Sequence, residues 1–212
     1  MLKITEKENK LISAVIVSAG NSTRMGGINK QFLELDGAPV IVNTITIFQR
    51  CHMIDEIIIV TRESEIDAVA KLVEKHDFYK VNNIVAGGET RQLSVYEGVT
   101  STSNITDLVV IHDGARPLVT VKVIEETIKA AAEFGAAATG VKVKDTVKVV
   151  DDNDNIIDTP DRAYMRFIQT PQVFDKKLYL YAVNTVENNK DFTDDCKLLE
   201  AYGKTVKFVD GD

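Results

Sequence analysis

The feature that most constrains this chain is a short apolar run, Ala14–Val17, that leads directly into a polar, glycine-rich segment ending at Gln31. Small and β-branched apolar residues that stop at a glycine are typical of a strand buried on both faces of a parallel sheet. The segment after the run contains two cations, Arg24 and Lys30. Free backbone N–H groups in such a turn, with positive charge beside them, form a cradle for a polyphosphate. The stretch therefore predicts a buried strand followed by a phosphate-binding loop.

This loop fits neither of the two common phosphate-binding motifs. A dinucleotide fingerprint needs Gly-x-Gly-x-x-Gly, but Asn-Ser follows Gly20. A Walker A loop ends in Gly-Lys-Ser/Thr, but Gly-Ile follows Gly26. The alternative interpretation is a plain strand-to-loop turn with surface cations, because isolated motifs often match by chance. From the loop alone, both interpretations stay open.

Length and composition favour a single domain over residues 1–212, because 212 residues with 44% apolar content can bury one sizeable core. The net charge of −7 argues against binding to nucleic acid or a membrane surface, both of which need a basic face. Cys51 and Cys196 lie far apart without metal-like spacing, and the apolar run Leu11–Ala19 is too short to span a membrane. We therefore expect reduced cysteines in a cytoplasmic protein without a signal peptide.

Predicted strands and helices alternate over the first two thirds of the chain. Strands are expected at Ala14–Val17, Glu56–Thr61, Val81–Ala86 and Leu108–His112, with helices starting at Val40, Ser64, Thr90 and Thr120. Asp67 is the expected capping partner of Ser64, and Gly135 the expected end of the fourth helix. This alternation predicts a Rossmann-like α/β fold, with a mostly parallel sheet, helices on both faces and ligands at the carboxyl ends of the strands. Further on we expect a strand at 164–169, helices at 176–188 and 193–202, and a strand at 205–209.

The alternation is interrupted at about residue 141 by the pattern of a β-hairpin. Val141–Val150 alternates apolar and polar residues, Asp151–Asn155 is a polar turn, and apolar residues resume at Ile156. We expect an inserted β-hairpin arm at about 141–160. Its half-apolar faces need a partner surface, so the pattern favours contact with a second subunit.

A polar turn after the fourth predicted strand, His112–Pro117, contains charged candidates for a site. The Asp113 carboxylate could hold Mg²⁺ through its oxygens, and Arg116 could pair with a phosphate. The alternative is that Asp113 only caps the turn before Pro117. His112 is interpreted as a structural residue, because no partner for a metal site lies near it in the sequence.

Another polar turn, Gly87–Ser94, follows the third predicted strand. Its paired glycines, Gly87 and Gly88, would let a base or ribose approach the backbone closely, with Arg91 or Ser94 near the ligand's edges. An ordinary glycine turn before a helix is an equally good interpretation of this segment on its own.

Taken together, these segments resemble the 2-C-methyl-D-erythritol 4-phosphate cytidylyltransferases, which are sugar-phosphate nucleotidyltransferases of non-mevalonate isoprenoid biosynthesis. Six matching pieces occur in the family's order and span nearly the whole chain, and although each is weak alone, six in register are a strong resemblance. They are Ser18-Ala19-Gly20 with Arg24-Met25-Gly26 and Lys30-Gln31, Gly87-Gly88 with Arg91 and Ser94, His112–Pro117, Lys144-Asp145-Thr146, Gln169–Phe174, and Thr193-Asp194-Asp195.

The resemblance implies transfer of a cytidylyl group from CTP to methylerythritol phosphate, with Mg²⁺ as cofactor. It implies that Arg24 and Lys30 are catalytic cations on the triphosphate and that Asp113 serves the metal. The implied CTP-binding residues are Ala19, Gly20, Gly87, Gly88 and Ser94. The implied substrate residues are Arg116, Thr146, Arg162, Thr170, Thr193 and Asp194. It also implies a homodimer in which the arm crosses to the partner, so that Thr146 and Arg162 complete the neighbour's site.

Two other functions stay open at this point. A ribitol-5-phosphate cytidylyltransferase would share the CTP loop, although the Asp-Gly-Ala-Arg-Pro and Thr-Asp-Asp runs favour methylerythritol phosphate. An inactive CTP-binding protein would need only the nucleotide contacts. The family continues with an Asn-Ile-Lys-x-Thr segment whose lysine touches the phosphates, whereas the sequence ends at Asp212. Either the sequence is trimmed there, or the lysine is missing and we expect impaired CTP binding and turnover.

Overall fold

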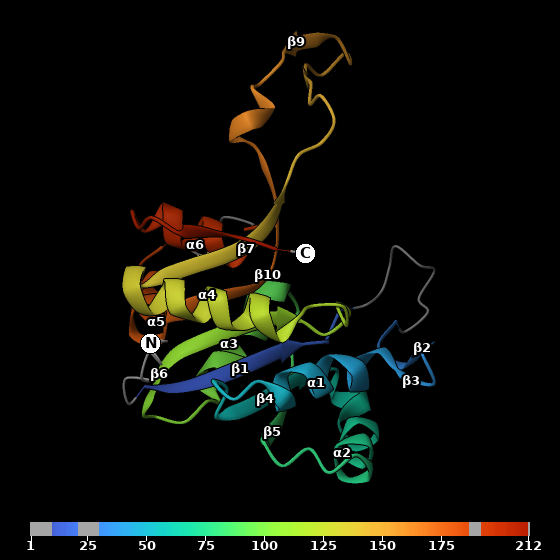
Figure 1. Ribbon diagram of the computed structural model, residues 1–212. Helices are drawn as coiled ribbons and strands as arrows, with labels where there is room; N and C mark the ends of the chain where they lie inside the picture. The colour runs from blue at the N-terminus through green and yellow to red at the C-terminus, as the bar shows by residue number, and fades with distance from the viewer. Residues whose placement is uncertain (1–9, 21–29, 187–191, 212) are drawn as a thin grey trace, which may run out of the picture.

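The computed structural model describes residues 10–20, 30–186 and 192–211, and the described chain forms a central seven-stranded sheet with helices packed against it (Figure 1). The strand order is β11-β7-β10-β6-β1-β4-β5. Strand β10 runs antiparallel to both of its neighbours, and the other pairs are parallel. The prediction of a mostly parallel sheet is therefore confirmed. The strands are β1 (Leu11–Val17), β4 (Glu56–Thr61), β5 (Val81–Ala86), β6 (Thr106–Asp113), β7 (Ala136–Lys142), β10 (Arg166–Asp175) and β11 (Lys207–Asp210).

The helices cover both faces of the sheet, as the alternation predicts. Side chains of Ala14 and Ile16 in β1 pack into one core cluster, and Val15 packs into another, because successive residues of a strand point to opposite faces. Helices α1 (Val40–Arg50), α2 (Ile66–Lys75) and α4 (Val121–Phe134) contribute to the first cluster. Helices α3 (Arg91–Thr100), α5 (Lys176–Thr185) and α6 (Asp195–Ala201) contribute to the second. Among these described helices, none is both long and apolar enough to cross a membrane.

Three helix ends agree with the capping signals in the sequence, and one contradicts them. Thr90 and Thr120 are the N-caps of α3 and α4, and Gly135 ends α4 in the left-handed conformation at φ 83°. The start predicted at Ser64 is wrong, because a 3₁₀ turn (η3, Glu63–Glu65) precedes α2 and its N-cap has no side-chain hydrogen bond. Glu65 there accepts a hydrogen bond from Thr61 and lies 3.0 Å from the Arg62 Nε, so its side chain is held back toward β4.

Strand β10 and helix α6, near the C-terminus, each begin later in the sequence than predicted. The strand expected from Tyr164 is preceded by a 3₁₀ turn, η4 (Arg162–Tyr164), in which the Asp161 carboxylate accepts from the Ala163 N–H at 2.9 Å. Strand β10 therefore begins only at Arg166. Helix α6 begins after Asp194, whose carboxylate accepts from the Lys197 N–H at 2.9 Å. The predicted extension of α5 to residue 188 is wrong, because the helix ends at Thr185 and the backbone of Val186 is extended.

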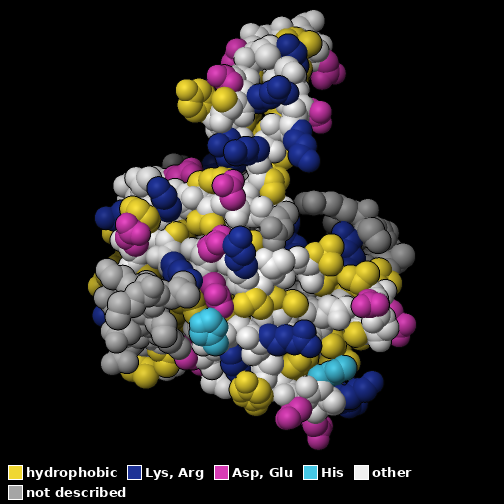
Figure 2. Space-filling view, viewed as in Figure 1, with side chains coloured by type: hydrophobic (Ala, Val, Ile, Leu, Met, Phe, Trp, Pro, Cys, Tyr) yellow, Lys and Arg dark blue, Asp and Glu magenta, His cyan; other side chains and the backbone are white. Residues whose placement is uncertain are grey.

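The predicted hairpin is present and projects from the body of the molecule between β7 and β10 (Figure 1). Its tip is formed by β8 (Val149–Val150) paired antiparallel with β9 (Ile156–Asp158). The Asp151 carboxylate closes the turn by accepting from backbone N–H groups at Asn153 and Asn155, both at 2.9 Å. Exposed apolar side chains lie along this arm, with basic side chains between them (Figure 2). An exposed apolar surface of this kind is typical of a contact site.

Candidate active site

A cleft of about 630 Å³ opens at the carboxyl ends of β1, β4, β5 and β6. Three backbone hydrogen bonds continue the parallel ladders beyond these strands and hold the turns in line: Ser18 N–H to Val60 at 2.7 Å, Gly87 N–H to Thr61 at 2.8 Å, and Gly114 N–H to Val17 at 2.8 Å. Ligands of open α/β sheets bind at this edge, in the crevice outside the strand ends. The cleft is lined by Val17, Ser18, Ala19, Gly20, Lys30, Gln31, Arg62, Glu63, Gly87, Gly88, Glu89, Thr90, Arg91, Ser94, Asp113 and Ala115.

Most of the residues predicted to bind the nucleotide meet in this cleft. They come from the turns after β1 and β5, the first turn of α3, the end of β6 and the 3₁₀ turn η2 (Lys30–Phe32). The predicted residues that line the cleft are Ala19, Gly20, Lys30, Gly87, Gly88, Ser94 and Asp113. Arg24, the other predicted catalytic cation, lies outside the described residues.

Close backbone packing explains the glycine pair after β5. A Cβ on Gly87 would lie 2.4 Å from the Cβ of Ala19, and a Cβ on Gly88 would lie 2.4 Å from that of Leu93. Real Cβ atoms do not approach so closely, so a side chain at either position would push the turns apart. A Cβ on Gly20 meets no described atom within 4 Å. Among the described residues, the turn after β1 thus leaves space beside Gly20, where a ligand could approach closely.

Ser94 lines the cleft from the first turn of α3, where its hydroxyl is engaged with the backbone. Its side chain is buried, and its hydroxyl donates to the carbonyl of Thr90 at 2.9 Å and lies 3.3 Å from that of Gly88. The hydroxyl therefore ties the start of α3 to the glycine turn. Because its proton is directed at these carbonyls, Ser94 is better placed to accept a hydrogen bond from a ligand than to donate one.

Basic and acidic side chains alternate in a row beside the cleft, in the order Arg116, Asp113, Arg91 and Asp195. The Asp113 Oδ2 pairs with the Arg116 Nε at 3.0 Å, and its Oδ1 lies 3.6 Å from the Arg91 Nε. Arg91 in turn donates through Nη1 to the buried Asp195 at 2.7 Å. Burial acts to lower the pKa of Arg91, but the neighbouring charges of Asp195 and Asp113 outweigh it and raise the pKa. Arg91 is therefore a permanent cation beside the Asp113 carboxylate.

The donor set around Asp113 fits a divalent cation that arrives with phosphates. Within the described residues, no cluster of three or more His, Cys, Asp and Glu side chains could hold a metal alone. Mg²⁺ is commonly bound by one or two carboxylates together with substrate phosphates and water. At 3.6 Å from Arg91, the Asp113 Oδ1 is beyond hydrogen-bonding distance of that guanidinium and is available to a cation.

A chain of hydrogen bonds through His112 orders the turn that carries Asp113 and Arg116. The Asp113 N–H donates to the Thr170 hydroxyl at 3.1 Å, which donates to His112 Nδ1 at 3.0 Å. The Nε2–H of His112 donates to the Arg116 carbonyl at 3.1 Å. Every donor in this chain has an acceptor only when His112 is neutral, and burial lowers its pKa to about 4. The structural interpretation of His112 agrees with this arrangement.

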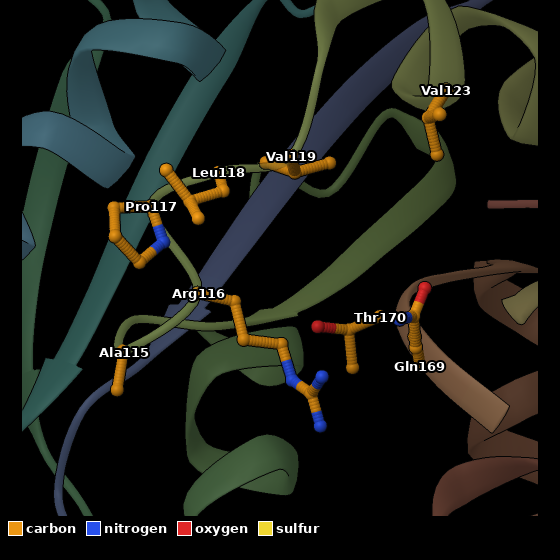
Figure 3. Close-up of a pocket in the computed structure, with 8 residues that line it drawn as sticks. All are labelled: Ala115, Arg116, Pro117, Leu118, Val119, Val123, Gln169 and Thr170. Carbon is orange, nitrogen blue, oxygen red and sulfur yellow. The ribbon is translucent and has the colours of Figure 1, made fainter. Parts of the chain in front are cut away.

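Two predicted substrate residues, Arg116 and Thr170, line a second hollow of about 300 Å³ (Figure 3). It adjoins the cleft through Ala115, which lines both. Pro117, Leu118, Val119 and Val123 give it an apolar wall opposite the Arg116 guanidinium. A hollow with apolar walls and a cation suits a small phosphorylated molecule better than a second nucleotide.

The other predicted substrate residues lie apart from the cleft. Thr193 and Asp194 line a separate hollow of about 240 Å³ beside β11, and the Asp194 carboxylate is engaged in capping α6. Thr146 and Arg162 are exposed on the arm, where Arg162 donates through Nη1 to the Lys144 carbonyl at 2.6 Å. Because the arm projects away from the sheet, these two side chains do not line the cleft of their own chain.

Sequence reasoning missed several residues that line the cleft, notably Arg62 and Glu89. Arg62 directly follows β4, so the rule that placed the other turns at the strand ends would also have selected it. The sequence indicates Asp195 only as part of the Thr193-Asp194-Asp195 motif. Its contact with Arg91 joins residues far apart in the chain, and no local pattern indicates it.

Comparison with known proteins shows the family of this chain. Residues 12–212 match the family described as 2-C-methyl-D-erythritol 4-phosphate cytidylyltransferase. The protein of that name from Caldanaerobacter subterraneus subsp. tengcongensis is 48% identical over 204 residues, which cover 95% of this chain and 90% of that protein. The one from Alkaliphilus oremlandii is 43% identical over 202 residues, covering 94% and 86%. The crystal structure of 4-diphosphocytidyl-2C-methyl-D-erythritol synthase from Anaerococcus prevotii superposes with a TM-score of 0.86 at 36% identity, covering 96% of this chain and 88% of that one. The chain belongs to the 2-C-methyl-D-erythritol 4-phosphate cytidylyltransferase family.

Proposed function

We propose that this protein transfers a cytidylyl group from CTP to 2-C-methyl-D-erythritol 4-phosphate, releasing pyrophosphate and forming 4-diphosphocytidyl-2-C-methylerythritol in non-mevalonate isoprenoid biosynthesis. The observation that carries the proposal is the cleft at the strand ends. There a glycine pair that tolerates no Cβ, the cation Lys30 and the carboxylate Asp113 lie together in a member of this family. The chain would act as one domain, residues 1–212, with the arm at about 141–160.

The reaction needs position and charge rather than a covalent intermediate. A phosphate oxygen of the sugar phosphate attacks the α-phosphorus of CTP in line, a new P–O bond forms, and the bond to the pyrophosphate oxygen breaks. Lys30, together with Arg24, would stabilise the negative charge that develops on the phosphates. Mg²⁺ held by Asp113 and the phosphates would neutralise further charge when bound. The turns at Gly20 and Gly87–Gly88, with Ala19 and Ser94, would hold the nucleotide.

The second substrate would bind in the hollow beside the cleft. Arg116 would pair with its phosphate, and Thr170 would fix the turn that carries Arg116. We infer that Thr146 and Arg162 act in the cleft of a second subunit, because they are exposed on an arm with apolar side chains and lie away from their own cleft. Thr193 and Asp194 lie just before α6 and apart from the cleft, so they would support the substrate site indirectly. The protein would then work as a homodimer joined through the arm.

Pyrophosphate release tests the reaction. The protein is incubated with CTP and Mg²⁺ and offered methylerythritol phosphate and ribitol phosphate in parallel. Release with methylerythritol phosphate alone is the expected result. Equal or better release with ribitol phosphate would assign the other cytidylyltransferase activity, and CTP binding without release from either substrate would indicate a nucleotide-binding protein.

The Lys30→Ala variant tests the proposed catalytic charge in the same assay. We expect kcat to fall by a factor on the order of 10²–10³, by analogy with the loss of one donor from an oxyanion site. The circular dichroism spectrum and Tm should stay close to those of the wild type, because Lys30 is partly exposed at the cleft. An unchanged kcat would remove Lys30 from the proposed mechanism.

A further inference from the structure

Asp195 is a fully buried carboxylate that the proposed mechanism does not use. Its side chain is 2% exposed, and both of its oxygens are engaged. Oδ2 accepts from the Arg91 Nη1 at 2.7 Å, and Oδ1 accepts from the Tyr179 hydroxyl at 3.0 Å. Its backbone N–H also donates to the Gln172 side chain at 3.2 Å. Elements α5, α6 and β10 thus combine to hold one negative charge against Arg91.

Arg91 connects this buried charge to the cleft. It is the first residue of α3, directly after the turn that contains the glycine pair, and its side chain is one-third exposed, at 33%, where it lines the cleft. Its Nε lies 3.6 Å from the Asp113 Oδ1, whereas its Nη1 lies 2.7 Å from Asp195. The shorter contact is with the buried carboxylate. The guanidinium is therefore held by Asp195 at a distance just too long for a hydrogen bond to Asp113.

The two carboxylate oxygens of Asp113 consequently differ in how closely a guanidinium contacts them. Oδ2 is occupied by the Arg116 Nε at 3.0 Å, but Oδ1 has no such short contact with Arg91. A divalent cation competes with any guanidinium for carboxylate lone pairs, because both bind through the same oxygens. Arg91 forms only a long ion pair with Oδ1, and if it moved less than 1 Å closer, both oxygens of Asp113 would be engaged in short, hydrogen-bonded ion pairs.

We propose that Asp195 is a positioning residue of the transfer reaction: it restrains Arg91, so that one oxygen of Asp113 stays open to the divalent cation. The proposal rests on the proposed function, in which Asp113 binds the metal that accompanies CTP. It assigns a role to the second aspartate of the Thr-Asp-Asp run, distinct from the helix-capping role of Asp194.

The Asp195→Asn variant tests this role, because it removes the charge and keeps the shape. Arg91 then loses its stronger partner and moves into hydrogen-bonding distance of Asp113. We expect the Mg²⁺ concentration for half-maximal rate to rise on the order of fivefold, as for a partly exposed ion pair. The kcat at saturating Mg²⁺ should stay near that of the wild type. An equal Mg²⁺ requirement in both proteins would overturn the proposal.

Metal binding can also be measured without turnover. Binding of Mn²⁺ is followed by electron paramagnetic resonance in the presence of a non-hydrolysable CTP analogue, and Asp195→Asn should bind it several-fold more weakly. This readout separates the two proposals. Wild-type protein that binds Mn²⁺ but releases no pyrophosphate would contradict the proposed function alone. Active wild-type protein with unchanged Mn²⁺ binding in Asp195→Asn would contradict the role of Asp195 alone.

Two further variants separate positioning from simple structural support. Tyr179→Phe removes the other hydrogen bond to the same carboxylate but leaves Arg91 paired, so metal binding should be unchanged. The double variant Asp195→Asn with Arg91→Gln removes both charges, which avoids an uncompensated buried ion, and should bind Mn²⁺ as tightly as the wild type. Weakened metal binding in the double variant would overturn the proposal, even if Asp195→Asn alone does not fold.

Discussion

A single buried side chain, His112, gives the fold a defined dependence on pH. Burial lowers the pKa of His112 to about 4 from an ordinary value of 6.5. Between these values the unfolded chain binds a proton that the native protein does not, so stability rises with pH across this range. The contribution of neutral His112 is fully present above about pH 6.5 and is lost as the pH falls toward 4. The full difference is on the order of 3 kcal/mol.

Urea unfolding of the wild type and His112→Gln across this pH range measures the effect. Glutamine is polar but does not titrate, so we expect the free energy of unfolding of the variant to depend less steeply on pH. The His52→Gln variant is the control, because His52 is exposed and pairs only at the surface, with Glu125 at 3.0 Å. If wild type and His112→Gln lose stability in parallel between pH 6.5 and 4, the buried neutral state assigned to His112 is wrong.

The start of helix α3 ties local helix capping to ligand binding. Thr90 accepts a hydrogen bond from the Leu93 N–H at 3.1 Å, and its carbonyl accepts from the Ser94 hydroxyl. We predict that Thr90→Ala lowers the free energy of unfolding by about 1 kcal/mol, the usual value of such a cap. It should also weaken CTP binding measured by calorimetry, because the adjacent glycine turn would lose its anchor.

Thr120→Ala is the matched control, because Thr120 caps α4 in the same way, accepting from the Val123 N–H at 3.3 Å, but does not line the cleft. It should cost similar stability without loss of CTP affinity, and Thr90→Ser should restore both properties. Equal CTP affinity in Thr90→Ala and Thr120→Ala would show that the cap of α3 does not order the nucleotide site.

Elements whose own residues determine their bounds could be predicted from the sequence. Strands β4 and β5 have the predicted bounds and helix α1 the predicted start, because β4 is a continuous apolar run, a glycine pair ends β5, and α1 carries a helical apolar stripe. The start of α2 could not be predicted, since the contacts of Glu65 with Thr61 and Arg62 compete with capping by Ser64. The start of β10 was misplaced for a similar reason, because Asp161 stabilises a turn over residues with strand propensity.

At the scale of the whole molecule, the sequence predicted the parts of the site that lie at the carboxyl ends of the sheet strands. Parallel strands bring their carboxyl ends to one edge, so the turns at Gly20, Gly87 and Asp113 were bound to meet once the alternation was recognised. The link from Arg91 to Asp195 could not be predicted, because it depends on how α6 packs against the sheet. In the proposed dimer, the position of the arm relative to the partner would likewise be set by contacts between chains rather than by local pattern.

The proposed sharing of sites between two subunits can be tested by complementation. In a two-fold dimer with crossing arms, each site would combine Lys30 of one subunit with Arg162 of the other. Lys30→Ala and Arg162→Ala should each be impaired as homodimers. When the two are unfolded together and refolded as an equal mixture, half of the dimers are mixed and each has one intact site, so activity should recover to about a quarter of the wild-type value. Refolding each variant separately and then combining them controls for recovery without exchange. If arms served their own subunits, every site in the mixture would carry one of the two substitutions, and the refolded mixture would be no more active than the average of its components.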